Sequence, residues 1–388
     1  MPAVISSPIH PVVDQLIDLV DEFVLPSQLL IPALATVVDP RDRRGVRHRL
    51  PKLLALSVCA VIAGARSFTA IAQWAADLAP HLSAGLGAGD TVPSESAFRR
   101  TLQRLDADHL DQVLGQWAAK RTAGFHGLRA VAIDGKSVRG ARTGDGRCPH
   151  LLAVITHIDG VVLGQLNVDV KTNEIPMLPT LLDTTDLNRT IITADALHCQ
   201  RSHASYLVTQ RGAHYLLTVK GNQPALHSQL AGLPWADVPT GHFAGGKAHG
   251  RIEQRCLKAL TVAAGINFPH AAQALRITRR TRRPRSRKWR TETVYAVTDL
   301  TAAQAQPQQL AEWIRGHWHI ENQLHWVRDV TYDEDRSQIR TGHGPQVMAS
   351  LRNLAISALR LAGHTNIAHA NRHYANRPDR PITLLLTS

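Results

Sequence analysis

Residues 128–134 read LRAVAID, and at this stretch the spacing of apolar residues changes from helical to strand-like. The run is too short for a helix, and it ends on a carboxylate, Asp134. Residues 151–170 then read LLAVITHIDGVVLGQLNVDV, which predicts two strands joined at Asp159-Gly160, a dipeptide typical of hairpin turns. The region therefore predicts an antiparallel start to a sheet.

The chain beyond this hairpin alternates helices with strands. The expected elements are a helix at 174–182, a strand at 189–194 (RTIITA) that stops at Asp195, a helix at about 200–210 and a strand at 214–220 (HYLLTVK). The order βββαβαβ indicates an α/β fold in which the later strands run parallel.

Upstream of Gly127 the apolar residues have helical spacing. The helical segments read VDQLIDLVDEF (13–23), KLLALSVCAVIAGA (52–65), SFTAIAQWAADLA (67–79), SAFRRTLQRL (96–105) and HLDQVLGQWAAK (109–120). Ser94 stands where the cap of the fourth helix is expected. The arginines of that helix are candidate phosphate contacts, although an ordinary amphipathic helix with a solvated basic face is the favoured interpretation: Arg99, Arg100 and Arg104.

Residues 235–300 interrupt the α/β pattern with Gly-rich, basic and short strand-like stretches, and helical spacing returns at 303–329 and 345–361. We therefore expect an all-α N-terminal domain preceding an α/β core with a β-rich insertion. The expected units are 1–125 (helical domain, a candidate for DNA binding), 126–234 (first part of the core), 235–300 (insertion) and 301–388 (C-terminal helical part of the core).

The composition favours a nucleic-acid partner. The 388 residues include 44 Lys and Arg against 31 Asp and Glu, a formal net charge of +13. The four cysteines form no C-x-x-C pair, which fits a reducing, cytoplasmic setting. The N-terminus lacks a secretory signal, and the longest apolar run, 53–65, is too short to span a bilayer, so no membrane partner is expected.

Asp134 and Asp195 each follow an apolar strand, at the edge where α/β sheets place their sites. Two close carboxylates repel each other unless a cation neutralises them, and Mg²⁺ prefers carboxylate oxygens and retained waters. The two acids therefore predict a magnesium site if their strands are neighbours. An Asp at a strand end also commonly starts a turn or caps a helix.

Glu321 lies within the helical segment AEWIRGHWHIENQLHWVRDV, and acidic, imidazole, indole and guanidinium groups share its face. The residues on that face are Ile314, His317, Trp318, Leu324, His325 and Arg328. This pattern is unusual for a solvated helix. The alternative is an amphipathic helix whose tryptophans are core residues and whose Glu321 pairs with His325 or Arg328.

Residues 279–290 (RRTRRPRSRKWR) hold eight Lys or Arg and no acid, which makes them strong candidates for phosphate contacts. Trp289 could stack on a base. A solvated hairpin tip is the alternative. Lys220 and Asn222 follow a predicted strand and are further candidates for the DNA channel, although a strand-to-helix turn accounts for them as well.

Two other motifs fail on spacing. IDGKS at 133–137 suggests a phosphate-binding loop, but Ala130 stands where that motif needs a glycine. His198-Cys199 and His317-x-His319 lack the paired spacing of a structural zinc site.

Four stretches in this order resemble the DDE transposases of bacterial insertion sequences, particularly the group of H-repeat-associated proteins. They are AIDGKSVRGA (132–141), ITADALHCQ (192–200), YLLTVKGNQP (215–224) and RGHWHIENQLHWVRDVTYDEDRSQIRTGHGPQVMASLRNLA (315–355). The resemblance covers nearly the whole chain. It implies a ribonuclease-H-like core whose catalytic, metal-binding acids are Asp134 on the first strand, Asp195 on the fourth and Glu321 on a later helix.

The resemblance further implies two Mg²⁺ ions, with Mn²⁺ as a substitute, cleavage at insertion-sequence ends and strand transfer into target DNA. The expected partners are double-stranded DNA, as terminal inverted repeats and target, and a second copy of the chain in a homodimer on DNA, in a bacterial cytoplasm and at the nucleoid when bound. Related transposases carry Tyr, Arg and Lys or Arg at offsets that fall here on Ile314, His317 and Arg328, of which only the last matches in type.

Two alternatives remain open: a ribonuclease-H-like nuclease without strand transfer, and an inactive DNA-binding relic of a transposase. The candidate DNA-binding residues are Lys220, Asn222, Arg279, Arg280, Arg282, Arg283, Arg285, Arg287, Lys288, Trp289, His317, Trp318, His325 and Arg328.

Overall fold

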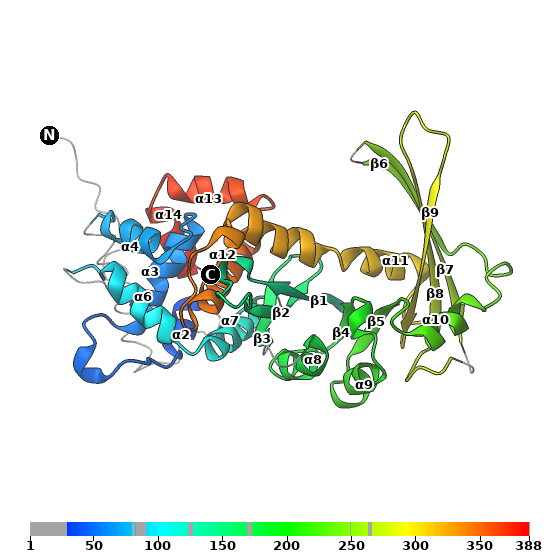
Figure 1. The fold of residues 1–388 in the computed structure, drawn as a ribbon, viewed down its shortest axis with the longest axis horizontal. Coiled ribbons are helices and arrows are strands. Elements are labelled where there is room, and N and C mark those ends of the chain that lie inside the picture. Colours follow the sequence, from blue (N-terminus) through cyan, green and yellow to red (C-terminus); the bar gives the residue numbers. More distant parts are fainter. Residues whose placement is uncertain are drawn as a thin grey trace.

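The computed structural model describes residues 29–79, 82, 91–122, 127–168, 173–248, 250–262 and 266–387. The molecule is elongated, with helices gathered at one end and the sheet extending to the other (Figure 1). The helix expected at 13–23 lies outside the described residues.

The described N-terminal region is helical, as the apolar spacing predicts. Its helices are α2 (Leu30–Ala35), α3 (Leu50–Ile62), α4 (Phe68–Ala76), α6 (Glu95–Arg104) and α7 (Ala107–Arg121), with a short 3-10 turn, η1 (Arg43–Gly45). Ser94 caps α6, because its hydroxyl accepts a hydrogen bond from the Ala97 amide at 3.3 Å. Helix α3 is buried on nearly all sides, which explains its continuous apolar sequence.

Among the described residues, nine strands form one sheet in the order β3-β2-β1-β4-β5-β9-β8-β7-β6. The first five are β1 (Arg129–Ser137), β2 (His150–Thr156), β3 (Val162–Val168), β4 (Thr190–Ala194) and β5 (His214–Val219). β1, β2 and β3 pair antiparallel, whereas β4 is parallel to both β1 and β5. This order, with a helix between β3 and β4, confirms the predicted ribonuclease-H-like α/β class.

The insertion extends this same sheet. Its strands are β6 (His242–Ala248), β7 (Arg251–Thr261), β8 (Gln273–Arg282) and β9 (Arg290–Thr298). The last of them, β9, pairs antiparallel with β5, for example Leu217 with Val297. Because backbone pairing continues across this junction, the insertion is held to the core by the sheet itself.

Strand β1 is longer than the sequence indicates. It continues three residues beyond Asp134, because β2 goes on pairing with it as far as Ser137 and His150. Pairing with β4, in contrast, stops at Ile133 and Ala194. Asp134 therefore lies inside a strand, at the point where one of the two neighbouring strands ends.

The remaining helices connect the strands or pack on the sheet and on the N-terminal helices. They are α8 (Glu174–Asp183), α9 (Arg201–Ser205) with its π-helical continuation η4 (Tyr206–Gln210), α10 (Pro224–Ala231), α11 (Pro307–Gly316), α12 (Gly344–Leu361), α13 (Ile367–Ala375) and α14 (Asp379–Thr387). The segment after α11 winds into two π-helical stretches, η5 (Ile320–His325) and η6 (Val327–Thr331). π-helical turns are rare and gather at functional sites.

Helix α12 joins the N-terminal helices to the sheet. It is buried along almost its whole length and packs on α3, α7 and β3. Gly115 on α7 also lies directly against the Leu163 carbonyl of β3, where a Cβ would not fit. The two regions share one hydrophobic core. None of the helices in the described part of the chain is both long and apolar enough to cross a membrane.

Candidate active site

Adjacent parallel strands place Asp134 and Asp195 side by side. The last pair between β1 and β4 is Ile133 with Ala194, and each acid is the next residue along the chain: Asp134 continues β1, and Asp195 directly follows β4. The Asp134 carboxylate accepts a hydrogen bond from the Gly135 amide, and Asp195 accepts one from the Leu197 amide, both at 2.9 Å. The expected capping role of Asp195 thus coexists with its place beside Asp134.

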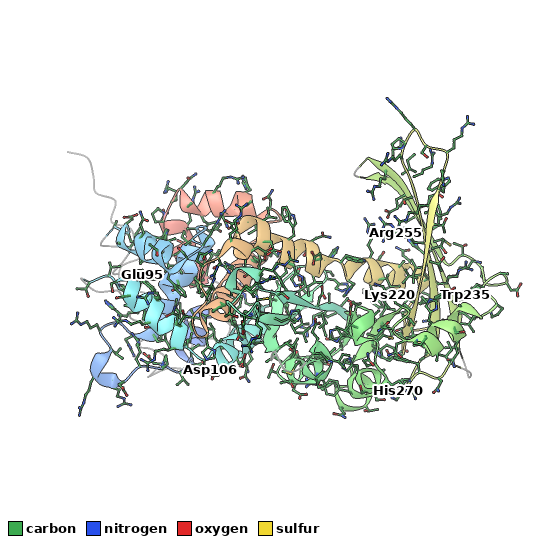
Figure 2. All side chains as sticks on the ribbon, viewed as in Figure 1. Glu95, Asp106, Lys220, Trp235, Arg255 and His270 are labelled. Atoms are coloured by element: carbon green, nitrogen blue, oxygen red, sulfur yellow. The ribbon has the colours of Figure 1, made fainter. Side chains whose placement is uncertain are left out.

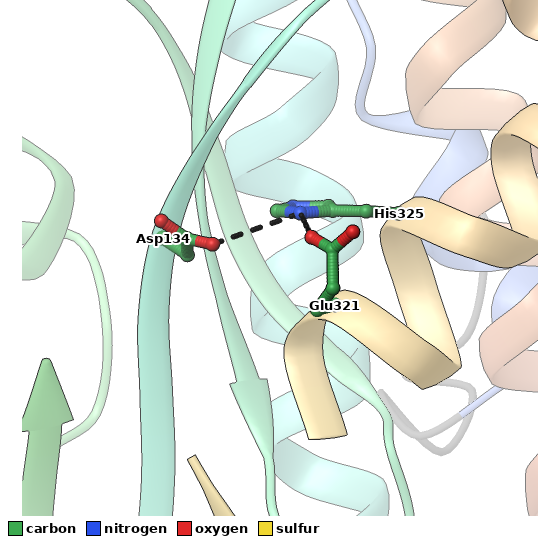
Figure 3. A group of neighbouring side chains, drawn as sticks. All are labelled: Asp134, Glu321 and His325. Carbon is green, nitrogen blue, oxygen red and sulfur yellow. Dashed lines mark hydrogen bonds and ion pairs between the residues drawn. The ribbon is translucent and has the colours of Figure 1, made fainter. Parts of the chain in front are cut away.

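Glu321 reaches the same point from the π-helical stretch η5. Figure 3 shows Asp134, Glu321 and His325 directed toward one another. The His325 Nδ1 lies 3.1 Å from Glu321 Oε2 and 3.8 Å from Asp134 Oδ2. One ligand atom from each of the three residues lies within 4.8 Å of the others, the spacing needed to hold a metal ion.

Burial and crowded negative charge shape the chemistry of Asp134. Burial raises the pKa of this carboxyl group, and the charges of Asp195 and Glu174 raise it further, while His325 and the Gly135 amide oppose them. Glu321 behaves differently, because its hydrogen bond with His325 lowers its pKa. The site therefore carries more negative charge than its own surroundings neutralise, which suits a divalent cation.

Lys136 ties the Asp134 strand to the Glu321 segment. It lies two residues after Asp134, on the same face of β1, and its ammonium contacts Asp329 of η6 at 2.6 Å. The lysine is nearly fully buried, and its charge helps to lower the pKa of Glu321. The alternation of a strand could have identified Lys136 from the sequence; its partner could not have been identified in that way.

A second acid, Glu174, lies behind Asp134, and sequence reasoning missed it. It is the first residue of α8, and its carboxylate contacts His150 Nε2 at 2.6 Å and His198 Nε2 at 3.2 Å. Burial alone would raise the pKa of Glu174, but hydrogen bonds from both histidines bring it to about 2. The cluster links β2, α8 and the turn after Asp195, residues with no common spacing in the sequence.

Gly135 allows this cluster to approach Asp134. A Cβ at position 135 would lie 2.5 Å from both Glu174 Oε1 and His150 Nε2. We expect Gly135→Ala to separate the pair and to destabilise the protein by about 1–3 kcal/mol, the usual cost of overpacking. Denaturant unfolding of Gly135→Ala measures this loss. Gly144→Ala is the matched control, because a Cβ there meets nothing within 4 Å; equal stability of the two variants would contradict the contact.

Several of the predicted DNA-binding residues lie near the acids. Lys220 is exposed at the end of β5, and Asn222 donates a hydrogen bond to the Ala196 carbonyl, next to Asp195. His317 lies against Thr193 of β4, and burial lowers its pKa to about 4. The Trp318 side chain is 60% exposed.

Two of the residues predicted to contact DNA are buried. Arg328 is fully buried, and its Nε donates to Glu334 at 3.0 Å, so its guanidinium does not reach a surface. His325 is also buried and faces Asp134 and Glu321 instead of solvent. Helical spacing placed both residues on the face of Glu321, but it does not show which part of that face the core covers.

The basic stretch forms the β8–β9 hairpin, which projects from the insertion (Figure 1). Arg279 is paired with Glu253 at 2.8 Å, and Arg280 and Arg282 stack on Trp289 with their guanidinium carbons about 5 Å from its ring centroid. The remaining cations of the loop are exposed: Arg283, Arg285, Arg287 and Lys288. Figure 2 shows Lys220 and Arg255 at this end of the molecule, with Glu95 and Asp106 toward the opposite end.

Comparisons with known proteins agree with this geometry. The family model described as "Transposase DDE domain" matches residues 125–358, and the one described as "DDE_Tnp_1-associated" matches residues 31–118. The chain is 30% identical to "Putative transposase YncI" of Escherichia coli O157:H7, over 86% of this chain and 87% of that protein. It is 28% identical to "H repeat-associated putative transposase YhhI" of Escherichia coli strain K12, over 85% and 90%.

Among solved structures, a piggyBac transposase synaptic complex with hairpin DNA aligns with 92% of this chain and 78% of that one, at 10% identity and a TM-score of 0.42. The family match covers the strands that carry Asp134 and Asp195 and the segment that carries Glu321. A DDE domain is a phosphoryl-transfer domain, and the acidic cluster lies within it. The chain therefore belongs to the DDE transposase family.

Proposed function

We propose that this protein cuts DNA at the ends of an insertion sequence and joins the released ends to target DNA, with Asp134, Asp195 and Glu321 as its catalytic acids. One observation carries the proposal. Asp134, at the point where β1 and β4 stop pairing, and Glu321 on η5 belong to one cluster whose ligand atoms lie within 4.8 Å of one another. When bound, two divalent cations activate the attacking oxygen and stabilise the leaving oxygen.

The residues of the site fit such cations. Asp134 is close to both other acids, because the charge of Asp195 raises its pKa and Glu321 shares its cluster. Asp134 and Asp195 supply oxygen ligands from neighbouring strands, and Glu321 supplies one from η5. Lys136 holds η6 against β1 through Asp329 and so keeps Glu321 in reach of Asp134.

Double-stranded DNA, as terminal repeats and target, is the substrate in this proposal. The exposed cations of the β8–β9 loop have no acidic partner among the described residues, so they are available to phosphates. Trp289, held under Arg280 and Arg282, supplies an aromatic face beside them. Two element ends have to be joined, so the acting species in the proposal is a homodimer on DNA.

Removing the charges of the loop should weaken the salt dependence of DNA binding. Replacing Arg283, Arg285, Arg287 and Lys288 together by Gln is expected to reduce the slope of log K against log salt by about 3 to 4, since each lost phosphate contact accounts for about 0.9. Fluorescence anisotropy over a salt series measures the slope. The double variant Arg372→Gln, Arg377→Gln removes exposed charge at the other end of the molecule and should leave the slope unchanged; equal slopes for all three proteins would contradict the assignment.

The deciding experiment uses the full chain with DNA that carries the element's own terminal repeats, with and without Mg²⁺. We expect Mg²⁺-dependent cleavage at the repeat ends and joining of the 3′-hydroxyl ends to a target plasmid. Cleavage without joining would identify a ribonuclease-H-like nuclease. Binding without any cleavage, in Mg²⁺ and in Mn²⁺, would identify an inactive relic.

A further inference from the structure

The position of His325 between the two acids gives the site a nitrogen ligand. The ring lies against both Asp134 and Glu321 (Figure 3) and is only 4% exposed. A side chain so buried cannot contact DNA. Its Nδ1 is instead hydrogen-bonded to the carboxylate of Glu321. We infer that the cation held by Asp134 and Glu321 takes His325 Nδ1 as its third protein ligand. The inference rests on the proposed metal-dependent function and concerns one of its cation positions.

The distances suit direct coordination. Neighbouring ligand atoms of a six-coordinate cation with bonds of about 2.1 Å lie about 3.0 Å apart. His325 Nδ1 is 3.1 Å from Glu321 Oε2, which fits without movement, and 3.8 Å from Asp134 Oδ2, which requires a closure of less than 1 Å. Asp134 is part-exposed and can turn toward a cation, whereas the imidazole is fixed by burial.

The backbone holds the three ligands in place. Glu321 and His325 are four residues apart on η5, a spacing that puts both side chains on one face. Ile320 and Leu324 anchor the same stretch in the hydrophobic core, and Asp134 sits within a strand that is paired on its β2 side. A site built on such elements presents its ligands with little freedom to rearrange.

The second ring nitrogen also argues against a purely structural histidine. Nε2 of His325 is buried and has no hydrogen-bond partner among the described residues. Buried polar groups that serve only the fold are nearly always satisfied, so the unpaired Nε2 indicates that this histidine is present for the contacts of its Nδ1 with the two acids. These two acids are the groups that would bind the cation.

A nitrogen ligand has a consequence for metal choice. Imidazole binds Mn²⁺ and later transition ions more readily than Mg²⁺, for which oxygen ligands are preferred. His325→Gln replaces the nitrogen by an amide that can offer oxygen. We therefore expect this variant to lose more Mn²⁺ affinity than the roughly 10–100-fold that loss of an outer-shell partner costs, and to lose less Mg²⁺ affinity.

Pulsed electron paramagnetic resonance of Mn²⁺ tests the inference directly. The full chain, free of DNA, is mixed with one equivalent of Mn²⁺ and examined for the modulation that a directly bound ¹⁴N nucleus produces. We expect modulation in the unaltered protein and in His319→Gln, whose ring lies on the same segment but binds the His157 carbonyl. We expect none in His325→Gln, with calorimetry showing that this variant still binds the ion.

Modulation that persists in His325→Gln, or its absence from the unaltered protein, would overturn the inference. If His325→Gln does not fold, Glu321→Gln serves instead, because loss of the neighbouring acid should also remove the ¹⁴N signal. The result is independent of the proposed reaction. Nitrogen coordination without DNA cleavage would leave the inference standing and refute the proposed function, and cleavage without nitrogen coordination would do the reverse.

Discussion

Asp134→Asn is expected to lower metal-dependent DNA cleavage on the order of a thousandfold while leaving the fold at least as stable. The activity falls because this carboxylate faces both Asp195 and Glu321, so no other acid can replace it. Metal-assisted stabilisation of a transition state amounts to several kcal/mol, and each 1.4 kcal/mol corresponds to a tenfold change in rate.

The stability of this variant should move in the opposite direction. Burial raises the pKa of Asp134, so its ionised form is disfavoured in the folded protein and destabilises it at neutral pH. Asn removes that charge, and the melting temperature in the absence of metal should be unchanged or higher. This separates a lost active site from a lost fold.

Asp159→Asn is the matched control for both measurements. Asp159 is exposed in the hairpin loop, where Asn-Gly is as well suited as Asp-Gly. Cleavage rates are measured under single-turnover conditions and melting temperatures without added metal. Asp134→Asn with cleavage within tenfold of the unaltered protein would remove this residue from the proposed site.

Glu334→Gln is expected to produce the largest loss of stability. Glu334 is fully buried between two buried arginines, and it accepts hydrogen bonds from Arg328 Nε at 3.0 Å and Arg352 Nη1 at 2.8 Å. The substitution removes the carboxylate that binds both arginines, and it leaves two buried guanidinium groups without their shared counter-charge. Breaking a buried ion pair in this way costs about 3–5 kcal/mol.

Chemical denaturation at pH 7 measures the change in the free energy of unfolding. Glu95→Gln breaks an exposed pair with Arg99 and should cost less than about 1 kcal/mol. Similar values for the two variants would show that the buried cluster contributes no more than a surface pair.

The same cluster predicts a pH dependence. Burial alone would raise the pKa of Glu334, but the charges of Arg328 and Arg352 bring it to about 2 in the folded protein. The folded pKa is below the unfolded one, so its contribution to stability is present above the ordinary pKa of a glutamate and is lost as the pH falls toward about 2. Glu334→Gln should therefore show a weaker loss of stability over that acidic range.

The sequence by itself determined the helices and strands and pointed to the three acids of the proposed site. Helical and alternating spacing of apolar residues depends only on the chain's own geometry, so α3, α7, β4 and β5 could be recognised directly. The same patterns placed Asp134 and Asp195 at the ends of apolar runs on two strands, and resemblance to a family added Glu321. These features are encoded within short stretches.

Tertiary structure decided which charged residues are buried and with whom. Arg328 has a helical spacing suited to a DNA contact, yet it is bound in the core by Glu334, six residues later, and by Gln165 of β3. Arg352 of α12 binds the same Glu334. Glu174 likewise lies beside Asp134 only because β2 and the turn after β4 bring His150 and His198 to it. Local periodicity shows which face of a helix a side chain occupies. Whether that face meets solvent, a core or a second acid depends on contacts between segments far apart in the chain, and only the folded structure contains them.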